Sequence, residues 1–69
     1  MIYVFKTSVK TKLQITKLKP YIDMMLPEAT WNFDLEDSDN ILRIDSNENI
    51  VSRITTLLEN HHYNCEELE

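Results

Sequence analysis

A chain of 69 residues makes one domain with one modest core, because so short a chain buries only about 60% of the surface that its unfolded form exposes. With 42% hydrophobic and 28% charged residues the composition is that of a globular protein, and no apolar run approaches the ~20 residues of a membrane span. The net charge of −5 argues against general nucleic-acid binding, and the complete absence of glycine excludes the glycine-rich loops that hold nucleotide phosphates.

The first part of the chain predicts a strand followed by a helix. Met1–Ser8 alternates in side-chain direction and is rich in aromatic and β-branched residues, which is typical of a strand. Thr11 and Gln14 match a capping box, so a helix is expected to begin there. Pro20 lies inside this helix and removes one backbone hydrogen bond, so it is expected to kink the helix or to split it in two. The apolar stripe of the helix consists of Ile15, Leu18, Ile22 and Met25.

The middle of the chain predicts a hairpin. In residues 31–36 apolar side chains alternate with Asn, Asp and Glu, which indicates a half-buried strand with an acidic outer face. Asp37–Asn40 is expected to be a turn, and Ile41–Asp45 a second strand. Since the chain has no glycine, positive φ angles are expected at Asn40 and, later in the chain, at Asn60.

The last third of the chain predicts a second helix and a short strand. Ser46 or Asn47 is expected to cap the helix, which should end at Asn60 or His61. Tyr63–Leu68 is expected to form a last strand at a sheet edge. The apolar stripe of this helix consists of Ile50, Ile54, Leu57 and Leu58.

This order of elements predicts a fold class. It is that of a ferredoxin-like β-α-β-β-α-β two-layer α+β sandwich in a single domain, residues 1–69, with an antiparallel sheet and both helices on one face. The other sheet face would be open to water. Aromatic side chains could form an exposed patch there or could lie in the core, which a domain this small needs to fill. They belong to Tyr3, Phe5, Tyr21, Trp31 and Phe33.

The apolar positions also follow a pattern known from one family. The pattern consists of the two helix stripes and of Leu42 and Ile44 in the third strand. It also includes His62-Tyr63, which stands where that family usually has Gly-Tyr. Over nearly its whole length the chain resembles the heavy-metal-associated domain, the fold of small copper chaperones. The resemblance implies a copper-chaperone-like scaffold.

The metal loop of that family does not carry over. The resemblance aligns its Met-x-Cys-x-x-Cys loop with residues 9–14, where Thr11 and Gln14 replace the cysteines. Copper(I) and zinc are held at such sites by thiolates, and a hydroxyl and an amide supply neither their softness nor their charge. We therefore expect the scaffold without its metal site and without a cofactor.

Lys10, Thr11, Lys12 and Gln14 surround the expected start of the first helix. Free backbone N–H groups and the helix dipole favour an anion there. Residues 1–19 carry five lysines and no acid, whereas the rest of the chain carries all twelve acids. One hypothesis is that this segment docks an acidic partner protein or, in a regulatory module, a small anion. The alternative is a solvated segment that attracts the acidic part of the fold, with Thr11 and Gln14 only capping the helix.

His61, His62 and Cys65 form the alternative candidate site, a metal-binding or metal-trafficking one. A zinc site needs three or four convergent ligands, and neighbouring residues rarely point the same way. Cys65 alternates with polar residues and is expected to face the core. As a single cysteine it cannot form an internal disulfide, which, with no signal-peptide pattern at the N-terminus, favours a reducing compartment such as the cytoplasm.

Two further activities are not favoured by the sequence. The acidic run of Asp34, Glu36, Asp37 and Asp39 lacks the central glycine and the closing Glu of a calcium loop. The Cys–His pair has no assignable third group for catalysis. The sequence therefore predicts a non-enzymatic interaction module with a protein partner, neither nucleic acid nor membrane. A homodimer formed through a sheet edge is a further alternative.

Overall fold

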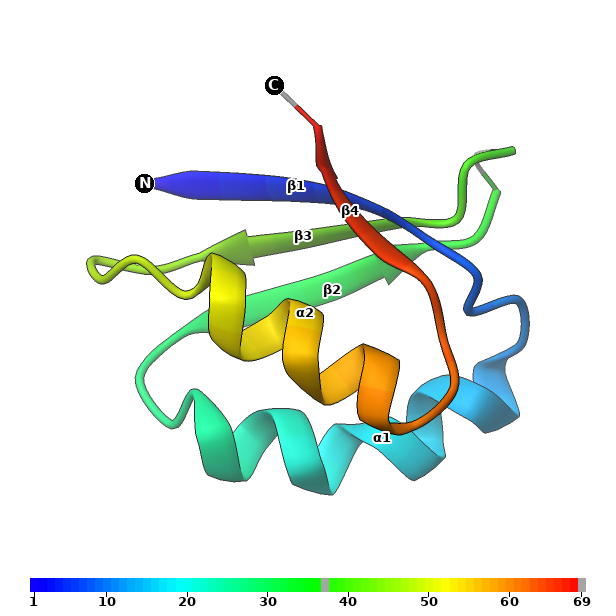
Figure 1. Cartoon of the computed structure of the whole chain (residues 1–69), viewed down its shortest axis with the longest axis horizontal. Helices are drawn as coiled ribbons and strands as arrows, with labels where there is room; N and C mark the ends of the chain where they lie inside the picture. The colour runs from blue at the N-terminus through cyan, green and yellow to red at the C-terminus, as the bar shows by residue number, and fades with distance from the viewer. Residues whose placement is uncertain (37, 69) are drawn as a thin grey trace.

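The computed structural model describes residues 1–36 and 38–68 (Figure 1). The predicted order of elements is confirmed, while Asp37, at the start of the expected turn, and Glu69 lie outside the described residues. The elements are β1 (Ile2–Thr7), α1 (Lys12–Met25), β2 (Thr30–Asp34), β3 (Ile41–Asp45), α2 (Val51–Asn60) and β4 (Cys65–Leu68).

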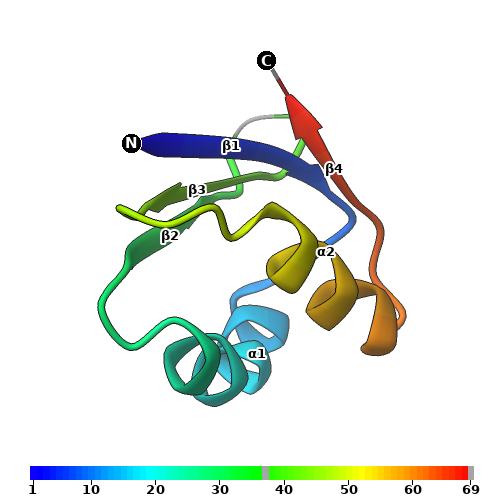
Figure 2. The ribbon, with the colours of Figure 1, turned by 60° about the vertical axis from the view of Figure 1, so that its left-hand side comes forward.

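The strands form one antiparallel sheet in the order β2-β3-β1-β4, so that β2 and β4 lie at its edges. Both helices pack on one face of this sheet, as the two views in Figures 1 and 2 show. The predicted two-layer α+β sandwich is therefore confirmed. Neither of the helices in the described part of the chain is long and apolar enough to cross a membrane.

The core lies between the sheet and the helices. Sheet register places Tyr3 and Trp31 opposite Ile44, and Phe33 opposite Leu42, so these side chains share the helix-covered face. The aromatic residues of the strands pack against the core, and the expectation of an exposed aromatic patch on the open face is wrong for them. The fully buried side chains are those of Phe5, Val9, Leu18, Ile22, Leu42, Ile44, Ile50, Ile54 and Leu58.

Helix α1 begins as predicted and runs through its proline. Thr11 is the N-cap, and the reciprocal bonds of the capping box with Gln14 are present. Pro20 does not split the helix, contrary to one of the two expectations. The proline removes a single backbone bond, and the buried Leu18 and Ile22 anchor the helix to the core on either side of it.

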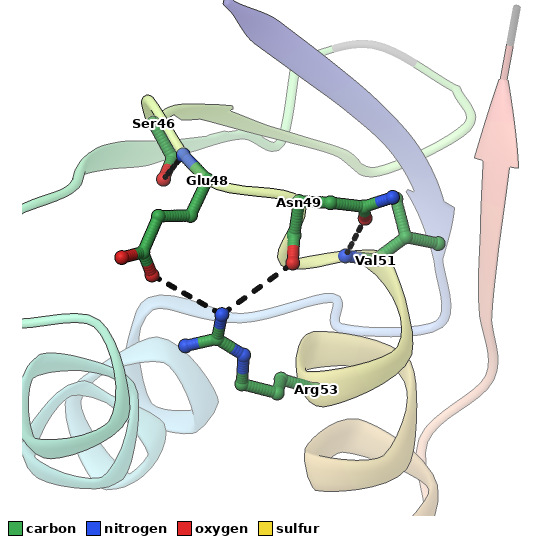
Figure 3. Close-up of polar contacts among 5 residues, drawn as sticks. All are labelled: Ser46, Glu48, Asn49, Val51 and Arg53. Atoms are coloured by element: carbon green, nitrogen blue, oxygen red, sulfur yellow. Dashed lines mark hydrogen bonds and ion pairs between the residues drawn. The ribbon is translucent and has the colours of Figure 1, made fainter.

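The start of α2 differs from the prediction. Its N-cap is Ile50, whose side chain makes no capping bond, so neither Ser46 nor Asn47 is the cap. The Ser46 N–H donates to the Met1 carbonyl at 2.9 Å, which keeps this residue beside β1. Asn49 Oδ1 accepts the Val51 N–H at 3.1 Å, so a side chain just before the cap satisfies one of the first helical donors (Figure 3).

Among the described residues two have positive φ angles, and the end of α2 accounts for one of them. Asn40 has φ 51, as predicted, but the second is at His62, φ 70, and not at Asn60, which is still helical. The His62 N–H donates to the Glu59 carbonyl at 3.0 Å, and the Tyr63 N–H to the Leu58 carbonyl at 2.9 Å. This pair of bonds is a Schellman motif, in which His62 occupies the position that usually holds glycine.

Candidate functional site

Several backbone donors at the start of α1 are bonded by side chains of the capping box. Gln14 Oε1 accepts the N–H groups of Lys10 at 2.7 Å and of Thr11 at 3.3 Å, while Thr11 Oγ1 accepts the Gln14 N–H at 3.1 Å. The Gln14 carboxamide oxygen thus occupies the place where a small anion would meet these donors. Thr11 and Gln14 act as caps, and the lysines remain as the part of the predicted site that can face a partner.

Three lysines of the basic segment, residues 1–19, form no ion pair with the acids that the structure describes. Among residues 1–36 and 38–68, Lys6 pairs with Asp39 at 3.7 Å and Lys19 with Asp23 at 2.8 Å. The two arginines pair with Asp34 and Glu48, and the N-terminus with Asp45. The expected attraction between the basic segment and the acidic rest of the chain is therefore realised only in part. Within the described part of the chain, Lys10, Lys12 and Lys17 form no ion pair.

Large apolar side chains lie among these lysines on the solvent side of α1. Leu13 is 65% exposed, Tyr21 52% and Met24 82%. Leu13, Lys17 and Met24 follow at helical spacing, so they form one ridge opposite the core stripe. We call the set of Leu13, Lys17, Pro20, Tyr21 and Met24 the outer face of α1.

A hollow adjoins this face. The rings of Tyr21 and His61 lie 4.6 Å apart between centroids, tilted by 50°. Together with Lys17, Pro20 and Tyr63 they border a space of about 420 Å³ that also touches the core residue Leu18. An aromatic hollow beside a cation and an exposed apolar ridge is suited to hold an apolar side chain of a partner.

His61, His62 and Cys65 are not brought together as a metal site. The His61 ring packs at an angle against Tyr21, His62 is exposed just after α2, and Cys65 is buried in β4. In the part of the chain that the structure describes, no three His, Cys, Asp or Glu side chains are placed to hold an ion.

The chemistry of Cys65 also disfavours metal binding or nucleophilic attack. Burial raises the pKa of its thiol to about 11, a hydrogen bond with Thr55 opposes the rise, and the Glu59 carboxylate adds to it. Thiolate is the form that binds metals and attacks substrates, and this thiol stays protonated near neutral pH.

The predicted acidic run has structural roles where it is described. Asp34 accepts the Glu36 N–H at 3.2 Å and pairs with Arg43 at 3.4 Å, and Asp39 pairs with Lys6. Asp37 lies outside the described residues. Each of these contacts uses a carboxylate that a calcium ion would need.

A second hollow, of about 370 Å³, lies where the α1–β2 and β3–α2 connections meet. Arg53 in its wall donates to Glu48 Oε2 at 3.2 Å and to the Asn49 carbonyl at 3.5 Å (Figure 3). The guanidinium is thus engaged with its own loop, and this hollow presents no uncommitted cation to a ligand.

Sequence reasoning found the lysines but missed the apolar part of the outer face. Leu13, Tyr21 and Met24 lie within the predicted helix, and the spacing of Leu13, Lys17 and Met24 would have revealed a second stripe. Comparison with protein-family models, with curated proteins and with solved structures finds no match.

Proposed function

We propose that this protein is a non-enzymatic interaction module that docks an acidic segment of a partner protein on the outer face of α1. The supporting observation is that, among residues 1–36 and 38–68, no carboxylate forms an ion pair with Lys10, Lys12 or Lys17, although the chain has an excess of acids. In a chain of net charge −5, such a cluster of lysines presents one attractive region to an acidic partner.

The exposed apolar side chains supply what charge alone does not. Surface ion pairs contribute only about 0–1 kcal/mol each, whereas burying a Leu or Met side chain contributes about 1.5–3 kcal/mol. Leu13 and Met24 offer such area on the ridge, and the hollow beside Tyr21 offers a place for a partner's side chain. The occupant that fits is an acidic segment with apolar side chains on one face.

The scaffold is, in this proposal, similar to the heavy-metal-associated domain with its metal loop replaced by a helix cap. The reciprocal bonds of Thr11 and Gln14 support it, because both side chains are occupied in capping. The single buried cysteine is in keeping with a reducing compartment such as the cytoplasm.

The experiment uses a synthetic amphipathic peptide with leucines on one face and glutamates elsewhere, together with its lysine counterpart. Titration is followed by amide NMR. The glutamate peptide is expected to shift resonances of α1 and of His61 and Tyr63, with binding that weakens as salt rises. The lysine peptide is expected to leave them in place.

Two variants with the same change in net charge provide the control. Lys12→Gln with Lys17→Gln removes two positive charges from α1, and Ser52→Glu with Thr56→Glu adds two negative charges to the solvent side of α2. Only the first is expected to weaken binding of the glutamate peptide, by about tenfold or less for two surface charges. If both variants weaken it equally, net charge and not the face of α1 governs binding, and the proposal is wrong.

A further inference from the structure

The two edge strands of the sheet differ in how well they are guarded against pairing with another chain. β4 (Cys65–Leu68) carries two charges, Glu66 and Glu67, at its centre, whereas β2 (Thr30–Asp34) carries one, Asp34, at its end, and neither strand has proline or lysine. Charges, lysines and prolines are the usual means by which edge strands are kept from self-association. In the part of the chain that the structure describes, no strand pairs with the outer side of β2.

The sequence of β2 is complementary to itself in one register. A two-fold axis perpendicular to the sheet keeps helix-covered side chains on the same face in both copies, so odd-numbered residues face odd-numbered ones. Only one such antiparallel register pairs all five residues of β2. In it Asn32 faces Asn32, Trp31 faces Phe33 twice, and Thr30 faces Asp34 twice.

These cross-strand pairs are favourable or neutral. Aromatic pairs directly opposite each other stabilise a sheet by about 0.2–1 kcal/mol, and no two like charges face each other within the five residues. β4 lacks this property: both registers that pair three of its four residues place Glu66 or Glu67 opposite its own copy. The difference singles out β2 as the edge that can pair.

The aromatic side chains at this edge are already held in place. Trp31 Nε1–H donates to Asp23 Oδ1 at 2.9 Å, and the Lys19 ammonium lies 5.6 Å from the Trp31 ring centroid. Phe33 meets the Trp31 ring edge to face, with centroids 5.8 Å apart. Side chains fixed before association lose little conformational entropy when a second strand arrives.

A hollow of about 330 Å³ lies between α1 and the end of β2. Its apolar wall is formed by Ile15, Phe33 and Leu35. Polar and charged residues form the rest of its lining, namely Lys12, Asn32, Asp34, Glu36 and Arg43. In the five-residue register Trp31 of the second copy faces Phe33, beside this hollow. The two-fold axis provides the same arrangement twice.

We propose that two copies of this chain associate by antiparallel pairing of their β2 strands, centred on Asn32, into one continuous eight-stranded sheet. This proposal does not depend on the proposed function, which concerns the outer face of α1. The two proposals predict opposite effects of salt, since salt is expected to weaken the docking of an acidic segment on α1. Two copies of net charge −5 repel each other, and Glu28 faces Glu36 just beyond each end of the paired strands, so salt strengthens self-association.

The experiment is sedimentation velocity over a range of protein concentrations with charge variants at Asn32. This side chain is exposed, so its replacement leaves the core intact. Asn32→Lys and Asn32→Asp each place two like charges opposite each other, and each is expected to weaken the dimer by about fivefold. An equimolar mixture places Lys opposite Asp, and is expected to restore the wild-type affinity or exceed it.

Asn60 provides the matched control. It is an exposed asparagine on α2, the helix that contacts β4 at the opposite edge of the sheet. Asn60→Lys and Asn60→Asp are expected to dimerise like the wild type, apart from the small effect of net charge.

Three outcomes would overturn the proposal. The first is a wild-type protein that sediments as a monomer at all concentrations up to about 1 mM, a range in which binding stronger than about 4 kcal/mol would be seen. The second is unchanged self-association in both Asn32 variants. The third is a stronger dimer with Asn32→Lys alone. A lysine that strengthens the dimer would indicate a register in which position 32 faces an acid such as Asp34 and not its own copy.

Discussion

The two helices lie in the same layer and are both anchored by buried aliphatic side chains, yet their solvent sides differ in kind. α2 turns polar residues outward, such as Ser52, Arg53 and Thr56. α1 turns outward Leu13 and Met24, which are 65% and 82% exposed, beside Lys17, which forms no ion pair among the described residues. A helix needs only one apolar stripe to dock on a sheet.

The second stripe of α1 is therefore unexplained by folding, and α2 shows what this fold looks like without it. Scattered exposed apolar residues are common, but here three large ones lie on one helix together with Lys17. Both helices contribute to the core, and the proposed recognition role concerns α1 alone. The following predictions test that division.

The largest effects on stability are expected at corresponding core positions of the two helices. Ile22 in α1 and Ile54 in α2 are both fully buried. Ile22→Ala and Ile54→Ala are each expected to lower the free energy of unfolding by about 2–5 kcal/mol, because each leaves a cavity. Urea unfolding measures this.

A domain of this size has little stability to lose, so the valine variants provide a graded version of the same test. Ile22→Val and Ile54→Val are each expected to cost about 0.5–1.5 kcal/mol. A loss at Ile54 with none at Ile22 would show that α1 is not anchored as α2 is.

The end of α2 gives an effect of opposite sign. His62 has φ 70 and occupies the glycine position of a Schellman motif. His62→Gly is expected to stabilise the protein by about 0.5–1 kcal/mol, because a side chain at positive φ strains the backbone. Asn60→Gly, within the last turn, is expected to destabilise it by up to about 1 kcal/mol. Thermal unfolding of both variants measures the difference, and a His62→Gly variant that melts below the wild type contradicts the assignment.

The sequence predicted the fold because its apolar periodicities are strong. Alternation in β1 and β2 and the stripes at Ile22 and Ile54 suffice to order the elements and to place the helices on one side. The predicted cap of α2 is wrong because Ser46 is engaged before the helix begins. Its Oγ accepts the Glu48 N–H at 3.1 Å, and its N–H bonds to the Met1 carbonyl, 45 residues away in sequence, a contact that no local pattern encodes.

The candidate site was predictable only in part for a similar reason. The cluster of lysines is visible in the sequence, but Lys6 in β1 pairs with Asp39 just before β3, while Lys17 pairs with none of the acids in the described residues. Which charges are neutralised depends on distances that no local pattern encodes. The exposed stripe of Leu13 and Met24 was encoded at helical spacing, but one helix was assumed to have one apolar face.

Smaller effects on stability are expected at the outer face of α1 itself. Leu13→Gln with Met24→Gln is expected to change the free energy of unfolding by no more than about 0.5 kcal/mol, because both side chains are largely exposed. Leu, Met and Gln also have similar helix propensities. The double variant should, however, elute earlier from a hydrophobic-interaction column.

The reciprocal change on α2 completes this test. Ser52→Leu with Thr56→Met gives α2 an apolar solvent side like that of α1, and is expected to delay elution. If the Leu13 and Met24 variant loses more than about 1 kcal/mol, these side chains belong to the folded core, and the division between the helices is drawn in the wrong place.

The smallest effect concerns how α1 is fastened to β2. Hydrogen bonds from Lys19 and then from Trp31 hold the pKa of Asp23 below its ordinary value of 3.8. A carboxyl whose pKa is lower in the folded than in the unfolded state stabilises the fold above its unfolded pKa. That contribution is lost as the pH falls through the lower, folded value.

The indole N–H resonance of Trp31 reports this carboxyl directly, and is expected to titrate with a midpoint below pH 3.8. Asp23→Asn should abolish that titration. The resonances of α2 should stay unchanged, because the hydrogen bond between Trp31 and Asp23 joins β2 to α1 and not to α2. Because the pair is exposed, the gain in stability is small and is weakened by salt. A Trp31 resonance that titrates at or above pH 3.8 would mean that the indole and the carboxylate are not bonded in solution, and that the edge of β2 is less firmly held by α1 than the self-pairing of this strand requires.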